Sequence, residues 1–217
     1  MALDQPDRDL VIVSGFGNKG GTELEPSLVD AINPAFSAVL ASTHTRTALY
    51  NPEIVIRRVT AEMQEKSPND RILVGHSYGA LIALIVACRT EMHKILKLFL
   101  IDGPLRSDVE VEPVGTWLKL FYKHYEAREA LALECEEALI GLDLSKIVTI
   151  GTGVDNIVSP EAKKLDGLQD IVLPAGGDLT GLQDLAPDSG ANIVLPPEFE
   201  GHRVKKSVPI ISRIIHE

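Results

Sequence analysis

A serine flanked by two glycines carries the strongest chemical signal in the sequence. The pattern G-x-S-x-G occupies residues 75–79, directly after the apolar run Arg71–Gly75 and at the start of the apolar helical pattern Tyr78–Thr90. When a chain turns from strand to helix within two residues, the central serine is forced into a strained backbone conformation that lifts its hydroxyl out of the sheet edge. The spacing therefore predicts that Ser77 is a nucleophile.

The residues around this serine support the same interpretation. Side chains at Gly75 and Gly79 would collide with neighbouring backbone, and the small Ala80 and Ala83 allow the helix to approach the strand closely. The Tyr78 N–H lies at the positive end of the predicted helix, where an oxyanion would form during attack on a carbonyl. We therefore expect Tyr78 to be one oxyanion donor.

A serine hydroxyl is a poor nucleophile unless a base within hydrogen-bond reach takes its proton. Of the six histidines, His202 is the best placed, because it follows the last predicted strand, Asn192–Leu195, and precedes the predicted helix Val208–His216. This position puts it on a loop at one edge of the sheet. His76 is adjacent to Ser77, but in such a turn its side chain points away from the hydroxyl. We predict that His202 is the base.

Two aspartates follow predicted strands and compete for the role of the acid that orients the base. Asp102 ends the strand Leu96–Ile101, and Asp155 follows the strand Lys146–Ile150. Asp155 is favoured because its loop leads to a predicted helix start at Pro160 and because a strand separates it from the histidine. Asp102 stays open as the alternative acid, and the aspartate that is not used would cap or brace a loop.

Short β-branched runs alternate with longer helical patterns, which is typical of a mainly parallel sheet flanked by helices. The strands are nearly continuous in Val, Ile and Leu, which suits strands covered on both faces. We predict a single α/β domain over residues 1–217. The predicted strands are Leu10–Ser14, Ala38–Ser42, Arg71–Gly75, Leu96–Ile101, Lys146–Ile150 and Asn192–Leu195, with a further possible strand at Ile171–Leu173; the predicted helices are Pro52–Glu65, Tyr78–Thr90, Pro160–Leu168 and Val208–His216.

Between Gly103 and Ser145 the chain takes far longer than a usual loop to reach the next strand. Trp117, Phe121 and Tyr125 follow one another at helical spacing in this stretch. We expect a helical, lid-like insertion at about 103–145 that covers one end of the sheet and acts as a lid or an acyl pocket. Ordinary helix packing is the alternative for the aromatic row.

Composition and charge narrow the classes of function. Of the 217 residues, 31 are acidic and 21 basic, and the formal net charge of −10 disfavours nucleic acid as a partner. Cys88 and Cys135 are the only cysteines and belong to no Cys/His cluster, so a disulfide framework and a structural zinc site have no support. A reducing, cytoplasmic compartment fits best. The acidic start Met1–Asp9 is unlike a signal peptide, and the longest strongly apolar run, Ala80–Cys88, is too short to span a bilayer, so we expect no stable membrane insertion.

Taken together, these motifs resemble the α/β-hydrolase superfamily, and the resemblance extends over nearly the whole chain. The family's order of nucleophile, acid and histidine is matched by Ser77, Asp155 and His202. The segment Val11-Ile-Val-Ser-Gly-Phe16-Gly-Asn is similar to the family's early strand and H-G-x-G oxyanion loop, with serine in place of the usual histidine. The resemblance implies a three-layer α/β-hydrolase fold, with helices on both faces of the sheet, and makes the Phe16 N–H the second oxyanion donor.

The resemblance also implies an activity. The D-x-I-V-x-P form at Asp155 is similar to bacterial lipases and palmitoyl-thioesterase-like hydrolases, whereas the L-x-D form at Asp102 is similar to thioesterase domains of fatty-acid and polyketide synthases, which carry the acid at that earlier strand. The expected reaction is hydrolysis of a small-molecule carboxylic ester through an acyl-enzyme, with an acyl thioester as the alternative substrate. No metal or organic cofactor is needed for it.

Two other classes compete with the hydrolase hypothesis. The segment Gly15–Gly20 matches G-x-G-x-x-G after the first strand, as in dinucleotide-binding domains, but the next predicted strand leads into Ser-Thr-His where such a domain has an acidic residue. A catalytically idle binding module with a hydrolase fold is the third class, because one fold hosts many functions.

Overall fold

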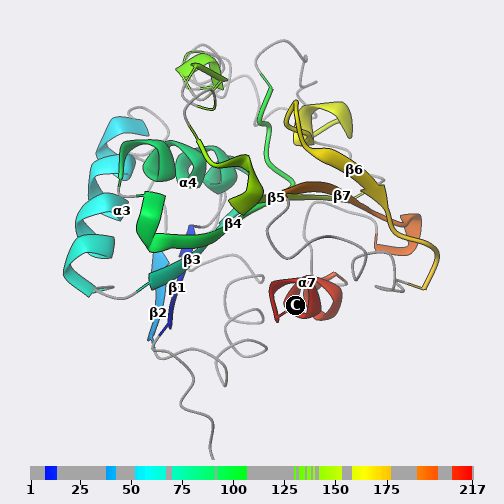
Figure 1. The fold of residues 1–217 in the computed structure, drawn as a ribbon, viewed down its shortest axis with the longest axis horizontal. Coiled ribbons are helices and arrows are strands. Elements are labelled where there is room, and N and C mark those ends of the chain that lie inside the picture. Colours follow the sequence, from blue (N-terminus) through cyan, green and yellow to red (C-terminus); the bar gives the residue numbers. More distant parts are fainter. Residues whose placement is uncertain are drawn as a thin grey trace, which may run out of the picture.

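Among the residues that the structure describes, seven strands form one sheet in this computed structural model of the protein (Figure 1). The described residues are 8–13, 38–42, 52–66, 70–90, 92–106, 130, 132–134, 136–137, 139, 142–152, 158–176, 190–199 and 207–216. The strands are β1 (Arg8–Val13), β2 (Ala38–Ser42), β3 (Asp70–His76), β4 (Ile95–Ile101), β5 (Ile147–Thr152), β6 (Gln169–Val172) and β7 (Ala191–Leu195). Their order is β2-β1-β3-β4-β5-β7-β6, and all neighbours run parallel.

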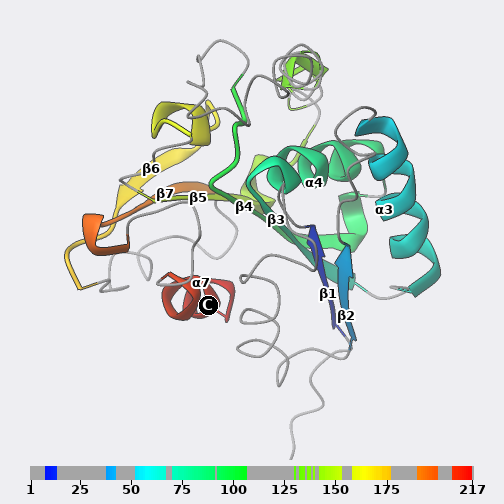
Figure 2. The same ribbon diagram turned by 180° about the vertical axis from the view of Figure 1, so that it is seen from behind.

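Helices cover both faces of this sheet (Figures 1 and 2). The helices α3 (Pro52–Lys66) and α4 (Tyr78–Arg89) lie on one face, and α7 (Val208–His216) lies on the other. Because alternate residues of a strand point to opposite faces, β1 contributes to two separate cores. Its Val11 packs in the core on the α4 side, and its Leu10 packs in the core on the α7 side. The predicted three-layer α/β architecture is confirmed.

The predicted strands agree with the observed ones to within about two residues at either end, as expected for boundaries inferred from sequence. The possible strand at Ile171–Leu173 is the edge strand β6, which begins two residues earlier. Three of the predicted helices correspond to α3, α4 and α7. Short 3₁₀ turns occur at Met92–Lys94, Leu144–Lys146, Glu161–Lys163 and Pro197–Phe199.

The predicted helix Pro160–Leu168 is wrong. Only the 3₁₀ turn Glu161–Lys163 forms there, and the next residue, Lys164, is already extended. The side chain of Asn192 on β7 accepts a hydrogen bond from the Leu165 N–H and donates one to the Leu165 carbonyl, both at 3.0 Å. These are the backbone groups that a continuing helix would have used, so a side chain 27 residues away replaces the helix.

The structure describes only the two ends of the predicted insertion. Trp117, Phe121 and Tyr125 lie outside the described residues, and the lid or acyl pocket stays a prediction. Near its second end, Ala132 is completely buried in the core on the α4 side. The Glu134 Oε1 lies 2.7 Å from the Nη2 of Arg89, the last residue of α4. This end of the insertion therefore packs on the layer that contains α4.

None of the helices in the described part of the chain combines the length and the apolar composition that crossing a membrane requires.

Candidate active site

Ser77 lies between β3 and α4, at the carboxyl edge of the sheet. Its φ of 55° and ψ of −129° are rare for a residue other than glycine, and such backbone strain costs on the order of 1–3 kcal/mol. The Ser77 N–H donates to the Ile101 carbonyl at the end of β4 (2.8 Å), and the Ser77 carbonyl accepts from the Ala80 N–H (2.9 Å). The serine side chain makes no capping hydrogen bond to α4. The predicted strained turn from strand to helix is confirmed.

Close packing of α4 on β3 explains the glycine before this serine. A Cβ atom at Gly75 would lie 2.5 Å from the Ala80 Cα, 2.6 Å from the Gly79 carbonyl oxygen and 2.8 Å from the Ala83 Cβ. Separations below 3.0 Å are not tolerated, and two of these three atoms belong to the helix backbone. The expected close approach of the helix, permitted by two alanines, is confirmed.

The residues on either side of Ser77 occupy different environments. Tyr78 is the first residue of α4, so its N–H lies at the positive end of the helix, and no acidic side chain occupies the first turn. Burial raises the pKa of the Tyr78 phenol to about 12, so this hydroxyl stays protonated near neutral pH. His76 is buried as the last residue of β3. The position of Tyr78 suits donation by its backbone N–H and not acid–base chemistry by its side chain.

Phe16, Asp155 and His202 lie outside the described residues, so their roles stay predictions. The strands that precede them are described, and in a parallel sheet these strands all end at the same edge. The order of the sheet thus determines which of these segments leave it as neighbours.

The strand registers make that arrangement specific. Val13 pairs with Gly75, so the chain leading to Phe16 leaves β1 beside β3, the strand that leads to Ser77. Thr152 pairs with Leu195, so the chains leading to the predicted acid and base leave β5 and β7 as immediate neighbours. The first pair suits two oxyanion donors, and the second suits an acid that orients a histidine.

Asp102, the competing acid, is fully buried at the end of β4 and has a positive φ of 47°. Its Oδ1 accepts hydrogen bonds from the Thr152 N–H (2.8 Å) and hydroxyl (3.0 Å), and it lies 2.7 Å from the Lys163 Nζ. Its Oδ2 is buried and has no hydrogen-bond partner within the described ranges. The contacts of Oδ1 support the loop-bracing role, whereas Oδ2 is the atom through which Asp102 would have to act as the acid.

Sequence reasoning did not single out Lys163 or Thr152. Lys163 follows Pro160 by three residues and precedes a second lysine, Lys164, and nothing in that pattern distinguishes a buried lysine from an exposed one. In the structure Lys163 is 2% exposed, whereas Lys164 forms an exposed ion pair with Asp170. Lys163 is buried because Asp102, at the end of β4, provides a buried partner for its ammonium group.

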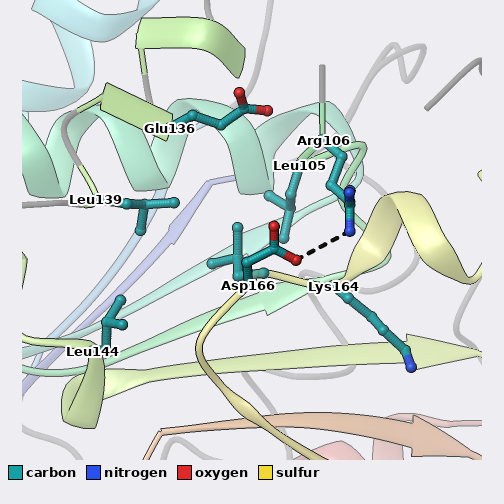
Figure 3. Close-up of a pocket in the computed structure, with 8 residues that line it drawn as sticks. Leu105, Arg106, Glu136, Leu139, Leu144, Lys164 and Asp166 are labelled. Atoms are coloured by element: carbon teal, nitrogen blue, oxygen red, sulfur yellow. Dashed lines mark hydrogen bonds and ion pairs between the residues drawn. The ribbon is translucent and has the colours of Figure 1, made fainter. Parts of the chain in front are cut away.

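A cavity of about 470 Å³ lies beside the segment that follows β4 (Figure 3). Its lining consists of four leucines, Leu105, Leu139, Leu144 and Leu165, and four charged residues, Arg106, Glu136, Lys164 and Asp166. Arg106 and Asp166 form an ion pair of 3.1 Å across it. Neither Ser77 nor Tyr78 lines this cavity, and we assign it no part in the chemistry.

Comparison with known proteins agrees with this geometry. A family model described as the alpha/beta hydrolase fold matches residues 31–187, a span that includes Ser77 and Asp155. Similar solved structures include Est1E from Butyrivibrio proteoclasticus, with 13% identity, a TM-score of 0.57, and coverage of 97% of this chain and 86% of that one. The thioesterase domain from the curacin biosynthetic pathway is 13% identical with a TM-score of 0.59, over 98% of this chain and 92% of that one.

A third similar structure is a serine hydrolase without a lid from Xanthomonas campestris, at 12% identity and a TM-score of 0.54, over 97% of this chain and 80% of that one. A search of curated proteins finds no match. At these identities the structural likeness shows the fold alone. The family model, however, covers well over half of the sequence, including the strained turn at Ser77. The chain therefore belongs to the α/β-hydrolase family.

Proposed function

We propose that this protein is a serine hydrolase that cleaves a small-molecule carboxylic ester through an acyl-enzyme intermediate. Ser77 attacks the ester carbonyl while His202 accepts the hydroxyl proton, and Asp155 holds the imidazole in the required tautomer. The ester C–O bond then breaks, and His202 returns the proton to the leaving alcohol. Water repeats the sequence on the acyl-enzyme, releases the carboxylic acid and regenerates Ser77.

The backbone N–H groups of Phe16 and Tyr78 are the proposed donors to the oxyanion that forms in each half-reaction. A preorganised donor of this kind contributes about 3 kcal/mol to stabilisation of the transition state. The positive end of α4 adds to it, because that helix starts at Tyr78.

The observation that carries the proposal is the conformation of Ser77. A positive φ at a residue that is not glycine is retained only where the surrounding structure enforces it. Here the enforcing contacts are the hydrogen bond to Ile101 and the packing of α4 on Gly75. They hold the serine at a strand end in a family of hydrolases, where its hydroxyl is not used to cap the helix.

An acyl thioester is the second candidate substrate, and it uses the same residues. The L-x-D form at Asp102, which is similar to thioesterase domains, favours it. The Asp102 carboxylate is buried at the end of β4, the strand next to β3. In this version Asp102 takes the place of Asp155 as the acid. The two candidates share the nucleophile, so the choice depends on the substrate and the acid.

The test is a panel of p-nitrophenyl esters and acyl-thioesters of graded chain length, assayed on wild type, Ser77→Ala and Ser212→Ala. Ser212 is a buried serine on α7 in the opposite layer and serves as the matched control. We expect Ser77→Ala to lose several orders of magnitude in kcat and all covalent labelling by a fluorophosphonate, with nearly intact folding. Ser212→Ala should keep both. Undiminished hydrolysis by Ser77→Ala would refute the proposed nucleophile, and the relative kcat/KM values identify the leaving group.

A further inference from the structure

Three side chains from separate segments meet in the interior at the carboxyl ends of β4 and β5. Asp102 follows β4, Thr152 ends β5, and Lys163 belongs to the 3₁₀ turn that follows Pro160. All three are at least 98% buried. The Lys163 Nζ lies 2.7 Å from the Asp102 Oδ1 and donates to the Thr152 carbonyl (3.0 Å) and hydroxyl (3.1 Å).

The cluster is fully built for a lysine ammonium group. Such a group offers three donors, and three oxygens lie within hydrogen-bond distance of it. The absence of a side chain at Gly151 also leaves room for the lysine stem, because a Cβ there would lie 3.2 Å from the Lys163 Cδ. Replacing a buried ion pair by apolar side chains is often neutral for stability, so a gain in stability is not by itself a sufficient reason for this pair.

The geometry of this cluster acts on Thr152 more than on any other residue. The Thr152 N–H and hydroxyl both donate to Asp102, and the carbonyl and hydroxyl both accept from Lys163. Thr152 is the last described residue before the segment 153–157, which contains Asp155, and Lys163 comes from the other side of that segment. The cluster therefore ties together the two stretches of chain from which the predicted acid loop departs.

The same cluster reaches the support of the nucleophile. Asp102 is adjacent to Ile101, whose carbonyl accepts the Ser77 N–H. The Asp102 N–H donates to the Ile150 carbonyl (2.9 Å), and the Leu105 N–H donates to the Ala162 carbonyl next to Lys163 (2.7 Å). The turn at Ser77 and the ends of the acid loop thus share one set of buried anchors.

We propose that Lys163 is a positioning residue, which acts through Thr152 and Asp102 to hold the acid loop in register with the Ser77 turn. The inference rests on the proposed function, in which Asp155 is the acid. The described contacts of Lys163 are with Asp102 and Thr152, and the proposal assigns it no proton transfer. Its effect on the reaction is to hold the acid where it can stabilise the protonated histidine.

The test compares Lys163→Met, the charge-neutral pair Asp102→Asn with Lys163→Met, and Lys164→Met. Lys164 is the adjacent lysine, and its ion pair with Asp170 is exposed, so it controls for loss of a lysine at this place. The readouts are kcat per fluorophosphonate-titrated Ser77, the pH profile of kcat/KM on a p-nitrophenyl ester, and the melting temperature. Counting titrated Ser77 removes the contribution of unfolded protein from kcat.

We expect kcat per titrated site to fall about 10- to 100-fold in Lys163→Met, as for other small misplacements of catalytic groups. The acidic limb of the pH profile should move to lower pH, because a misplaced acid no longer stabilises the imidazolium form. The neutral pair leaves no buried unpaired charge and should regain stability, but not kcat or the acidic limb, because the Thr152 carbonyl still lacks its donor. Lys164→Met should match wild type in all three readouts.

Wild-type kcat per site and a wild-type acidic limb in the neutral pair would overturn the proposal and leave Lys163 a purely stabilising residue. If Lys163→Met fails to fold, the neutral pair is compared with Asp102→Asn alone, so that a loss caused by Asp102 itself is not counted as an effect of Lys163. Equal kcat per titrated site in these two variants would also overturn the proposal. Failure of the proposed function has a different signature: wild type without esterase or thioesterase activity, or Ser77→Ala with full activity. Neither of those results depends on Lys163.

Discussion

Gly75→Ala tests how closely α4 must approach β3. The added methyl group would lie 2.5 to 2.8 Å from three atoms of α4, and the Ala80 Cα and the Gly79 carbonyl oxygen cannot rotate away because they are backbone atoms. Gly75 is the second-to-last residue of β3, is paired on both sides and shows no positive φ, so its backbone conformation alone does not oppose alanine. The whole effect of the substitution must come from displacement of α4.

The expected magnitude follows from the kind of contact. Forcing an extra carbon into a well-packed interior costs typically 1–3 kcal/mol, and the backbone clash places this substitution at about 3 kcal/mol, the upper end of that range. For a chain of this size, 1 kcal/mol lowers the melting temperature by about 2–4 °C, which gives a fall of about 6–12 °C. Because α4 carries the Tyr78 N–H and follows Ser77 directly, the rate of fluorophosphonate labelling should fall as well.

Gly176→Ala is the matched control for this substitution. Gly176 has a φ of 86°, and a Cβ there would meet nothing within 4 Å. Alanine at that position costs only the backbone term, roughly 1–2 kcal/mol, and should leave the labelling rate unchanged. Urea denaturation measures the free energy of unfolding, and a time course of fluorophosphonate labelling measures the labelling rate. If Gly75→Ala is as stable as wild type and is labelled at the wild-type rate, then α4 does not pack on β3 as closely as described.

Three further outcomes are expected. Asp155→Asn should lower kcat by roughly 10⁴, as in the general triad case, and Asp102→Asn by far less; the reverse ranking in steady-state assays would make Asp102 the acid. If the insertion forms an acyl pocket, each added methylene of the substrate should stabilise the transition state by about 0.8 kcal/mol, measured through kcat/KM, until the pocket is full. Phe121→Ala should then change the preference for acyl-chain length more than it changes the melting temperature. Equal kcat/KM for all chain lengths would make the aromatic row ordinary core. Burial raises the pKa of the Cys88 thiol to about 11, so in a Cys135→Ser background iodoacetamide should react slowly at pH 8 and much faster as the pH approaches 11, and fast reaction at pH 8 would contradict the burial.

The strained turn at Ser77 could be predicted because everything that produces it is local in sequence. An apolar strand, a glycine at each side of the serine and two small residues on the first helical turns dictate a close strand-to-helix junction. The seven strands and three helices were predictable for a similar reason, since the strands are short, nearly continuous apolar runs and the helices are longer segments with helical patterns. Even the assignment of Leu10 and Val11 to opposite cores follows from alternation along one strand.

The predicted helix Pro160–Leu168 failed because a partner from another strand decided its conformation. A proline start and a run of good helix formers favour a helix, but the Asn192 amide takes both backbone groups of Leu165. Local propensity is worth tenths of a kcal/mol per residue, and tertiary hydrogen bonds to buried groups outweigh it. No residue near position 165 in the sequence indicates that the Asn192 side chain binds these backbone groups.

The sequence by itself determined the strained turn at Ser77, the order of the predicted catalytic residues along the chain and the alternation of strands and helices that gives the three-layer fold. These depend on local contacts or on the pattern within each element. Only the tertiary structure decided the state of Asp102 and Lys163. Two charged residues 61 positions apart become a buried pair because β4 and β5 are neighbours in the sheet and their ends meet at one edge. Burial removes the competition of water, so a pairing that no local pattern encodes holds the ends of these two strands together.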